Sequence, residues 1–312
     1  MHILVTGSKG QLGCAFRHLF TAGASEVGVV PDALCNAEVD YIDRSDVDIA
    51  SFEAVSSWFD EHKPYDVVIN CAAMTNVDGC DADRKAAFAA NAQGPYHLAL
   101  ACAQQGAALV HVSTDYVFSG TEERPRTEDD IPHPISGYGQ SKFAGEALVR
   151  ATCPQSYIVR TAWLYGYVGK NFVKTMLSLA QTHSHITVVA DQLGNPTSAE
   201  DVAYAICQML TCGKPGIYHC TNEGTCSWAE FAQAIMDEFG RSCTVEPISS
   251  EEYKKAHPAT ADRPHFSSLD KRALRQNCQH TMRSWQEALT SYAHNFRKFA
   301  RDREEQHCEN SS

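Results

Sequence analysis

The 312-residue sequence contains no apolar run that approaches the roughly 18 residues of a membrane-spanning helix. It begins with MHILVTG, which is typical of a strand that leads into a glycine loop, and no basic and apolar leader stands before it. These absences predict a protein that is neither inserted into a membrane nor secreted, and they favour the cytoplasm.

Basic residues are in the minority, with 26 Lys and Arg against 38 Asp and Glu and a formal net charge of -12. Proteins that bind nucleic acids usually carry basic clusters, so we expect no nucleic-acid partner. Individual basic side chains can still bind the phosphates of a nucleotide.

No C-x-x-C pair occurs among the 13 cysteines. Their odd number, the lack of metal-site spacing and the lack of a leader argue against disulfides and structural zinc. We expect reduced, mostly buried thiols, no metal site and no catalytic cysteine.

Short apolar runs alternate with amphipathic stretches through the first half of the chain. They predict strands at 2–7, 38–43, 66–73, 107–114 and 156–166, and helices at 11–20, 52–62, 87–106 and 138–151. Strands that alternate with helices pair in parallel, with helices on both faces. The predicted fold class is therefore α/β, a doubly wound parallel sheet of Rossmann type. Residues 23–37 are either a loop insertion, which we favour, or contain a strand at 27–30.

The pattern becomes less regular and rich in turns after residue 166. This change predicts a Rossmann domain at 1–166, to which some later segments return, and a smaller substrate-binding lobe mainly at 167–300. The polar end of the chain, residues 301–312, is expected to be disordered.

Three glycines, Gly7, Gly10 and Gly13, lie between the first predicted strand and the first predicted helix. Glycine permits a tight turn there and lets backbone N–H groups approach a pyrophosphate at the helix N-terminus. The position at the first strand–helix junction favours a dinucleotide site over a tight turn without a ligand. Gln11 and Leu12, in the same loop, belong to the predicted cofactor site.

The end of the second predicted strand leaves the choice of coenzyme open. Ligands of parallel sheets bind at the carboxyl ends of the strands. Asp43 could accept a hydrogen bond from a ribose hydroxyl, whereas Arg44 could bind the 2′-phosphate that distinguishes NADPH from NADH. Asp48 and Ile49 could flank the adenine, although Asp48 could instead cap the helix that follows.

The next strand ends in Ala72, Ala73, Met74 and Thr75. Small residues there would let a dinucleotide lie across the strand end. A tight turn between strand and helix is the alternative interpretation of this segment.

A hydroxyl, a phenol and an ammonium group come next along the chain. Thr114 ends a predicted strand, and Tyr138 and Lys142 are four residues apart in SGYGQSKFAGE, on one face of a helix. A nearby ammonium group favours the phenolate, so we expect Lys142 to lower the pKa of Tyr138. The three side chains could hydrogen-bond a carbonyl oxygen, protonate it and hold the cofactor ribose. A surface helix that happens to carry one Tyr and one Lys is the alternative for the pair alone.

With these motifs, the sequence closely resembles the extended short-chain dehydrogenase/reductases, and within them the dTDP-4-dehydrorhamnose reductases. The resemblance covers about residues 1 to 270 and rests on ILVTGSKGQLG, VDIAS, VVINCAAMTNVD, NAQGPYHLA, VHVSTDYVFSG, YGQSKFAGE, RTAWLYG, KNFVKTML, DQLGNPT, GIYHCTNEGTCSWAEFA and RPHFSSLD. It implies that NADPH or NADH reduces the 4-keto group of a dTDP-linked 6-deoxy sugar, the last step towards dTDP-L-rhamnose. Tyr138 would donate the proton, Lys142 would bind the nicotinamide ribose, and Thr114 would polarise the keto group.

The resemblance also implies substrate contacts. Asp115 and Trp163 match family positions that touch the substrate, and Arg263 is a candidate partner of the nucleotide diphosphate. A turn residue, a core aromatic and a surface salt bridge are the respective alternatives. Met74 departs from the family pattern, because many members carry an aromatic residue or His there.

Other readings of the same resemblance stay open. One is a non-catalytic NADP-binding protein like the regulatory subunit of methionine adenosyltransferase, and another is a reductase or epimerase of a different nucleotide sugar. Thr114 and Trp163 favour the reductase over the regulatory subunit. Some family members dimerise around a magnesium ion, so a homodimer and magnesium stay open, with no ligand assigned in this chain.

Overall fold

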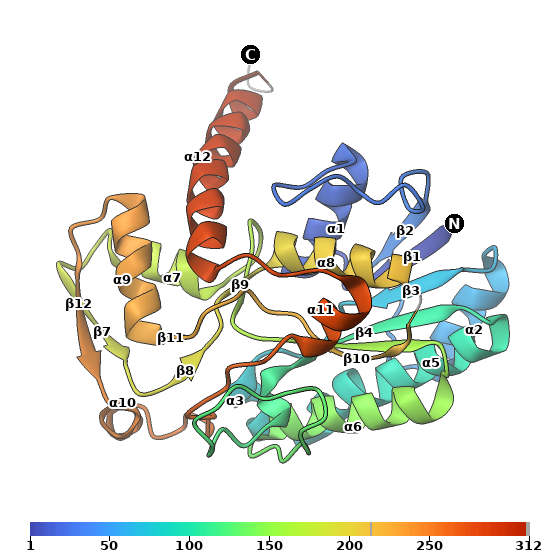
Figure 1. Cartoon of the computed structure of the whole chain (residues 1–312), viewed down its shortest axis with the longest axis horizontal. Coiled ribbons are helices and arrows are strands. Elements are labelled where there is room, and N and C mark those ends of the chain that lie inside the picture. Colours follow the sequence, from blue (N-terminus) through green and yellow to red (C-terminus); the bar gives the residue numbers. More distant parts are fainter. Residues whose placement is uncertain (213, 310–312) are drawn as a thin grey trace.

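A six-stranded parallel sheet forms the centre of the larger lobe (Figure 1). The structure, a computed structural model, describes residues 1–212 and 214–309, and residues 299–309 by their backbone alone. The strands are β1 (His2–Thr6), β2 (Glu38–Ile42), β3 (Val67–Asn70), β4 (Ala108–Thr114), β5 (Ser156–Thr161) and β10 (Gly216–His219). Their order is β10-β5-β4-β3-β1-β2, and every neighbouring pair is parallel.

Helices cover both faces of this sheet (Figure 1). Successive side chains of a strand point to opposite faces. Ile3 and Val5 therefore pack with one set of helices and Leu4 with the other. The first set is α1 (Gln11–Ala22), α8 (Ala199–Cys212) and α11 (Arg272–Cys278), and the second is α2 (Phe52–Glu61), α5 (Gly94–Gln105) and α6 (Gly137–Thr152). The predicted fold class, a doubly wound parallel sheet, is confirmed.

Short helical pieces join these elements: α3 (Val77–Ala82), α4 (Arg84–Phe88), the π-helical turn η1 (Ala89–Gln93) and the 3-10 turn η2 (Asp115–Val117). The helix predicted at 87–106 is thus α5 preceded by η1. The strand predicted at 156–166 ends at Thr161 and resumes only at Leu164, because Trp163 has a left-handed backbone with φ 47.

The second lobe has its own core and small sheets. Its strands are β6 (Leu164–Tyr165), β7 (His185–Val189), β8 (Leu193–Gly194), β9 (Thr197–Ser198), β11 (Cys226–Ser227) and β12 (Thr244–Ile248), and its helices are α7 (Phe172–Leu179), α9 (Trp228–Phe239), α10 (Ser250–Ala256) and α12 (Trp285–Glu309). The strands pair as β12-β7, β11-β8 and β6-β9. Apolar residues of β7, α7, α9 and α12 form a core separate from the two layers of the central sheet.

Segments from both halves of the chain build the larger lobe. β10, α8 and α11 follow residue 166 in sequence but pack with the central sheet. The division into domains at residue 166 stays a prediction. The segment 301–312, predicted to be disordered, overlaps the end of α12, and residues 310–312 lie outside the described residues.

The segment 23–37 is a loop insertion, as favoured from the sequence. It contains a bridge between Ala24 and Val29 but no strand of the sheet. Val30 and Leu34 are buried against the layer of α1 and α8. The carboxylate of Glu26 lies 3.5 Å from the guanidinium of Arg283. The insertion is therefore packed onto the fold.

The strand order reverses at β1, because β2 lies on one side of it and β3 on the other. In open parallel sheets, ligands bind outside the carboxyl ends of the strands at such a point. Among the described residues, no helix is both long and apolar enough to cross a membrane.

Candidate active site

The turn after β1 brings the backbone close to neighbouring segments. A side chain at Gly7, whose φ is +64, would begin 2.7 Å from the backbone nitrogen of Ala72. At Gly13 it would begin 2.4 Å from the carbonyl oxygen of Gly7. Cβ atoms do not approach other atoms so closely, so both positions require glycine.

The N-terminus of α1 is open towards the cleft. Its N-cap residue, Gly10, supplies no side-chain cap, and the first N–H groups of a helix have no partner within the helix. Gln11, Leu12 and Gly13 line the cleft at this end. The glycine turn leaves a space that any side chain would fill, and this space lies beside the free N–H groups of α1. The arrangement fits the pyrophosphate of a dinucleotide.

The end of β2 lies beside this turn. The carboxylate of Asp43 accepts hydrogen bonds from the backbone N–H groups of Lys9, at 3.0 Å, and Arg44, at 2.8 Å. The Arg44 guanidinium lies 3.3 Å from Asp48, and the Lys9 ammonium donates to Ser45. Asp43 thus tethers the glycine turn, and two basic side chains lie next to it.

Asp48 and Ile49 do not line the cleft. Ser51, and not Asp48, caps α2, whereas Asp48 accepts a hydrogen bond from the backbone of Ala50. Ile49 is buried, and a side chain at Gly94 of α5 would begin 2.7 Å from it. The alternative that Asp48 caps the helix is therefore wrong, and the adenine contacts of both residues stay a prediction.

After β3, alternate residues face the cleft. Ala73 and Thr75 line it, whereas Ala72 and Met74 do not. The backbone N–H of Ala72 donates to the side chain of Asn70 at 3.1 Å. The segment therefore turns out of the strand with alternate residues exposed to a ligand.

A buried asparagine of the π-helical turn fixes this segment against α6. The Asn91 side chain accepts from the backbone N–H of Met74 at 2.8 Å and donates to its carbonyl oxygen at 3.0 Å. Its amide also donates to the hydroxyl of Ser141 at 3.0 Å. Asn91 was not among the predicted site residues.

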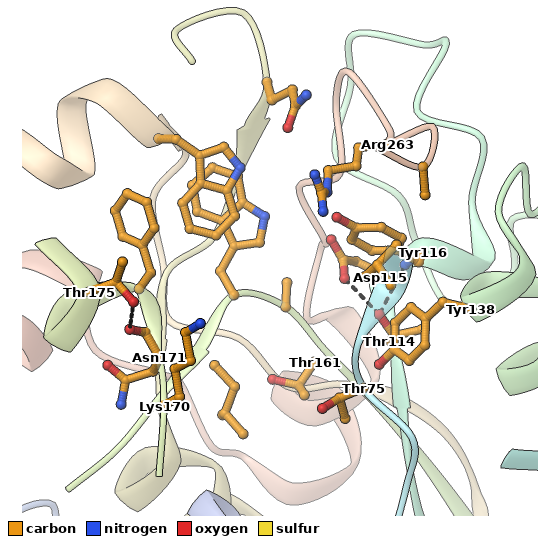
Figure 2. Close-up of a pocket in the computed structure, with 18 of the residues that line it drawn as sticks. Thr75, Thr114, Asp115, Tyr116, Tyr138, Thr161, Lys170, Asn171, Thr175 and Arg263 are labelled. Atoms are coloured by element: carbon orange, nitrogen blue, oxygen red, sulfur yellow. Dashed lines mark hydrogen bonds between the residues drawn. The ribbon is translucent and has the colours of Figure 1, made fainter. Parts of the chain in front are cut away.

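Thr114, Tyr138 and Lys142 come together at the end of β4. Thr114 is the last residue of β4, and Tyr138 and Lys142 lie on the first two turns of α6. All three line the cleft, and Figure 2 shows Thr114 and Tyr138 on one wall together with Thr75, Asp115 and Tyr116. Thr114 and Lys142 are buried, so the alternative of a surface helix is wrong for the Lys142 side chain.

Glycines let α6 lie close to its neighbours. A side chain at Gly139 would begin 2.2 Å from the carbonyl oxygen of Tyr116. One at Gly145 would begin 2.2 Å from the carbonyl oxygen of Asn91. Both contacts bring backbone against backbone, and they hold the helix that carries Tyr138 close to η2 and η1.

The expected lowering of the Tyr138 pKa is not found. Burial raises the pKa of Tyr138, and a hydrogen bond to Thr114 opposes that rise only in part. The Lys142 ammonium donates a hydrogen bond of 2.6 Å to the carbonyl oxygen of Val112 on β4. Burial lowers the pKa of Lys142 to about 8, and the negative charge of Glu146 acts in the opposite direction. Loss of water around the phenol is therefore the largest influence on the pKa of Tyr138, and the charge of Lys142 is not among the causes of its shift.

Asp115 follows Thr114 and is also buried. The Thr114 hydroxyl donates to the Asp115 carboxylate at 2.9 Å. Burial raises the pKa of Asp115 to about 6, although hydrogen bonds from Ser267 and Thr114 lower it. The ring of Tyr116 meets that of Tyr138 edge-on, with 5.6 Å between centroids.

The opposite wall of the cleft carries stacked aromatic rings. The Trp163 indole lies parallel to that of Trp228, with centroids 3.5 Å apart, and Phe172 lies 4.5 Å from Trp228. A side chain at Gly194 would begin 2.6 Å from the Trp163 ring. All three aromatic residues line the cleft, so Trp163 is a wall residue as well as a packed aromatic.

Arg263 combines the two interpretations that the sequence left open. Its guanidinium lies 3.2 Å from the carboxylate of Asp78 on α3, and the residue also lines the cleft. The backbone N–H of Ala261 donates to the same carboxylate at 2.9 Å. Asp78 therefore holds the segment of the second lobe that carries Arg263 against the larger lobe.

The cleft that these residues share has a volume of about 1210 Å³. Pockets for one drug-sized ligand are roughly 300–1,000 Å³, so this cleft has room for two ligands. In Figure 2, Lys170, Asn171 and Thr175 of the second lobe lie across it from Thr114 and Tyr138. Among the described residues, no three His, Cys, Asp or Glu side chains form a group that could hold a metal ion.

Two of the residues that shape the site were missed from the sequence, namely Asn91 and Trp228. Asn, Gly and Pro in NAQGPY interrupt a helical pattern, which is the signal for Asn91. Ser227 and Glu230 form a capping box that places Trp228 at the start of α9. Neither signal shows which way the side chain points.

The doubly wound sheet, the glycine turn and the Tyr–Lys pair of α6 define a short-chain dehydrogenase/reductase of the extended type. The chain belongs to the RmlD family, since the family model described as RmlD substrate binding domain matches residues 1–298.

Individual relatives span almost the whole chain. The spore coat polysaccharide biosynthesis protein SpsK of Bacillus subtilis is 41% identical over 93% of this chain and 96% of its own length. The crystal structure of a dTDP-4-dehydrorhamnose reductase from Clostridium acetobutylicum is 41% identical, with a TM-score of 0.87 over 95% of this chain and 100% of that one. That of the Bacillus anthracis dTDP-4-dehydrorhamnose reductase, in complex with NADP, is 36% identical, with a TM-score of 0.85 over 93% and 98%.

Proposed function

We propose that this chain reduces the 4-keto group of dTDP-4-dehydro-L-rhamnose to give dTDP-L-rhamnose, with NAD(P)H as reductant. The observation that carries the proposal is one cleft that contains both the glycine turn and the group Thr114, Tyr138 and Lys142. Relatives named dTDP-4-dehydrorhamnose reductase at 41% and 36% identity support the substrate.

The residues at the glycine end fit a nicotinamide dinucleotide. Gly7, Gly10 and Gly13 leave room for its pyrophosphate, and the N-terminus of α1 favours the negative charge. Ala73 and Thr75 lie between this end and Tyr138, along the path that the cofactor would follow. When bound, the cofactor supplies the hydride.

NADPH is the coenzyme that we favour. Lys9 and Arg44 lie beside the end of β2, where their positive charges can bind a 2′-phosphate. The carboxylate of Asp43 already accepts two backbone hydrogen bonds, which leaves it less able to bind a ribose hydroxyl. The Bacillus anthracis relative was crystallised with NADP.

Tyr138 is the proposed proton donor to the keto oxygen. The raised pKa keeps the phenol protonated at neutral pH, as a proton donor requires. Thr114 and Tyr138 lie on the same wall of the cleft at the end of β4. The Lys142 ammonium, held one turn away by Val112, stabilises the phenolate that remains after the proton has left.

The second lobe is the proposed site of the sugar nucleotide. Trp163 and Trp228 offer a flat apolar surface for a sugar ring, and Arg263 supplies a positive charge for the diphosphate. Asp115, which lies behind Thr114, is a proposed substrate contact. We expect the enzyme to act in the cytoplasm and to have no nucleic-acid partner, which agrees with this substrate. A homodimer is a further expectation from the family.

The experiment is to mix purified protein with enzymatically prepared dTDP-4-dehydro-L-rhamnose and follow the oxidation of NADPH and NADH in parallel. We expect oxidation that depends on the sugar and is faster with NADPH. If neither coenzyme is consumed while the protein still binds one, the proposal fails and a regulatory, non-catalytic role takes its place. Consumption with a different nucleotide sugar only would reassign the substrate.

A further inference from the structure

A buried ion pair lies under the helix that carries Tyr138 and Lys142. Glu146 follows Lys142 by four residues on α6, and Arg160 projects from β5. The Arg160 guanidinium donates two hydrogen bonds to the Glu146 carboxylate, at 2.9 and 2.7 Å. Both side chains are at most 2% exposed. Such a pair is costly to bury and contributes little to stability, which raises the question of its purpose.

Arg160 is fixed from its other side. One of its nitrogens lies 3.4 Å from Nε2 of His219, whose Nδ1 lies 3.0 and 2.9 Å from the carbonyl oxygens of Arg126 and Asp270. Nδ1 must therefore carry the proton, which leaves Nε2 free to accept from Arg160. Burial lowers the pKa of His219 to about 3, so this ring is neutral. The Phe118 ring covers the guanidinium at 5.1 Å.

The other groups around Lys142 carry no compensating charge. The ammonium faces the Val112 carbonyl oxygen on β4. Burial raises the pKa of the Cys71 and Cys80 thiols, so both stay protonated. Burial also lowers the pKa of His111 on β4, which keeps that ring neutral. Glu146, one turn along the same helix face, is the carboxylate placed to offset the burial of the ammonium.

We propose that Glu146 is a positioning residue of the active site: Arg160 holds its carboxylate in place through two hydrogen bonds, one helical turn from Lys142, and the negative charge of that carboxylate favours the charged form of the buried lysine. The inference rests on the proposed function. Arg160 is required because its two hydrogen bonds fix the buried carboxylate in position. Three side chains from α6 and β5 thus form one chain of alternating charge that ends at the proton donor.

The inference predicts a shift in pH dependence. Lys142 is charged below its pKa of about 8, and Glu146 raises that pKa against the effect of burial. Without Glu146 the lysine loses its proton at lower pH. The alkaline limb of the kcat profile is the fall of kcat at high pH as Lys142 loses its proton. This limb should move towards neutral pH by about one unit, because the charge removed lies one helical turn away.

The test is the double variant E146Q/R160M, assayed with the sugar nucleotide and NADPH from about pH 6 to pH 9. E146Q alone leaves the buried guanidinium without its carboxylate and can unfold the protein, whereas the double variant removes both charges. At pH values above the alkaline limb, we expect kcat of the double variant to be about tenfold lower than that of the unchanged protein. Near pH 6, the two kcat values should agree within about twofold. A limb that does not move, or a loss equal at every pH, would overturn the inference.

Two further variants serve as controls. D201N/R283M removes another bidentate pair, between α8 and the segment before α12, with hydrogen bonds of 2.8 and 2.7 Å. It should leave the alkaline limb in place. R160M alone leaves Glu146 buried with no cation except Lys142. Because R160M retains Glu146, its alkaline limb should lie at the same pH as that of the double variant or above it. An R160M limb below that of the double variant contradicts the inference.

Cofactor affinity separates this inference from the proposed function. If the unchanged protein binds NADPH but does not turn over the sugar, the proposed function fails. The same variants are then compared by NADPH binding over the same pH range, because Lys142 lines the cofactor cleft. If the pH at which NADPH affinity falls is lower by about one unit in E146Q/R160M, the role of Glu146 is supported. If that pH is unchanged, the role is overturned.

Discussion

The two ends of the cleft, the glycine turn and the catalytic end with Thr114, Tyr138 and Lys142, are built from different parts of the chain. At the glycine end, the backbone forms the site, and side chains are absent where a ligand would lie: Gly7 and Gly13 have no space for a Cβ. At the catalytic end, buried polar and ionisable side chains form the site, with Thr114, Asp115 and Lys142 at 5% exposure or less. In the proposed reaction, the glycine end would bind a charged pyrophosphate through fixed dipoles, and the catalytic end would move a proton.

This difference determines how each end depends on the rest of the molecule. The glycine turn depends on close backbone contact with Ala72 after β3 and on hydrogen bonds to the end of β2, among them the one to Asp43. The catalytic end depends on α6 being held against β4, on Asn91 of the π-helical turn and on charges in β5. A change at one end should therefore affect binding alone, and a change at the other should affect turnover and stability.

The largest expected effect comes from Tyr138→Phe, which removes only the hydroxyl of the proposed proton donor. We expect kcat to fall by about 10²–10⁴-fold, because general acid catalysis contributes that much. The dissociation constant for NADPH should stay within about twofold, because the glycine end is untouched. Steady-state kinetics and a fluorescence titration measure the two quantities.

Tyr96→Phe, a half-buried tyrosine of α5, is the matched control and should leave kcat unchanged. Turnover of the Tyr138 variant close to that of the unchanged protein would show that another group donates the proton.

A smaller effect, on binding, is expected for Gly13→Ala. The new Cβ would lie 2.4 Å from the carbonyl oxygen of Gly7, so the turn must open and its N–H groups lose their alignment. We expect the dissociation constant for NADPH to rise at least about tenfold, which corresponds to about 1.4 kcal/mol.

Gly23→Ala tests the other end of the same helix. Gly23 has φ +70 and no atom within 4 Å of an added Cβ. This variant should lower the free energy of unfolding by about 1 kcal/mol, measured with urea, and leave NADPH binding intact. Equal loss of binding in both variants would contradict the local character of the glycine end.

A further expected effect concerns how stability depends on pH. The pKa of Asp115 is raised to about 6 in the folded protein, from 3.8. The folded protein therefore holds this proton more tightly than the unfolded chain does, and stability falls as the pH rises from about 4 to about 6. Asp115→Asn, which cannot ionise, should raise the free energy of unfolding by about 1–3 kcal/mol at neutral pH.

The gain should vanish below about pH 4, where Asp115 is protonated in both states. Urea unfolding of the two proteins at several pH values measures it. A gain that is constant with pH, or a loss at neutral pH, would mean that the carboxylate is not destabilising in the folded protein.

Much of the fold could be predicted, because it depends on local patterns. The strands that end in Thr6, Ile42 and Thr114 carry apolar runs next to turn residues, and these patterns survive in the structure. The π-helical turn could not be predicted, since Asn91 is held by contacts with Met74 and Ser141 that lie far away in sequence.

The site divides in the same way. The glycine turn and part of the strand ends could be predicted from position alone: Gly7, Ala73 and Thr114 line the cleft, whereas Asp43 and Met74 do not. Asp48 and Ile49 do not line the cleft, since Ile49 packs against Gly94 of α5 and Asp48 pairs with Arg44 and accepts from the backbone of Ala50. The pKa of Tyr138 could not be predicted from the spacing to Lys142, because burial depends on the whole fold.

The edge strand β10 has a consequence for synthesis on the ribosome. β10 pairs with β5, yet the chain builds β6, α7, β7, β8, β9 and α8 between the two. Until β10 emerges, β5 is an open edge with unpaired N–H and C=O groups, which other chains can join. The larger lobe therefore cannot finish folding before much of the smaller lobe has been made. A chain cut at residue 166 should therefore aggregate rather than fold. The two lobes depend on each other for folding as well as for the cleft that they share.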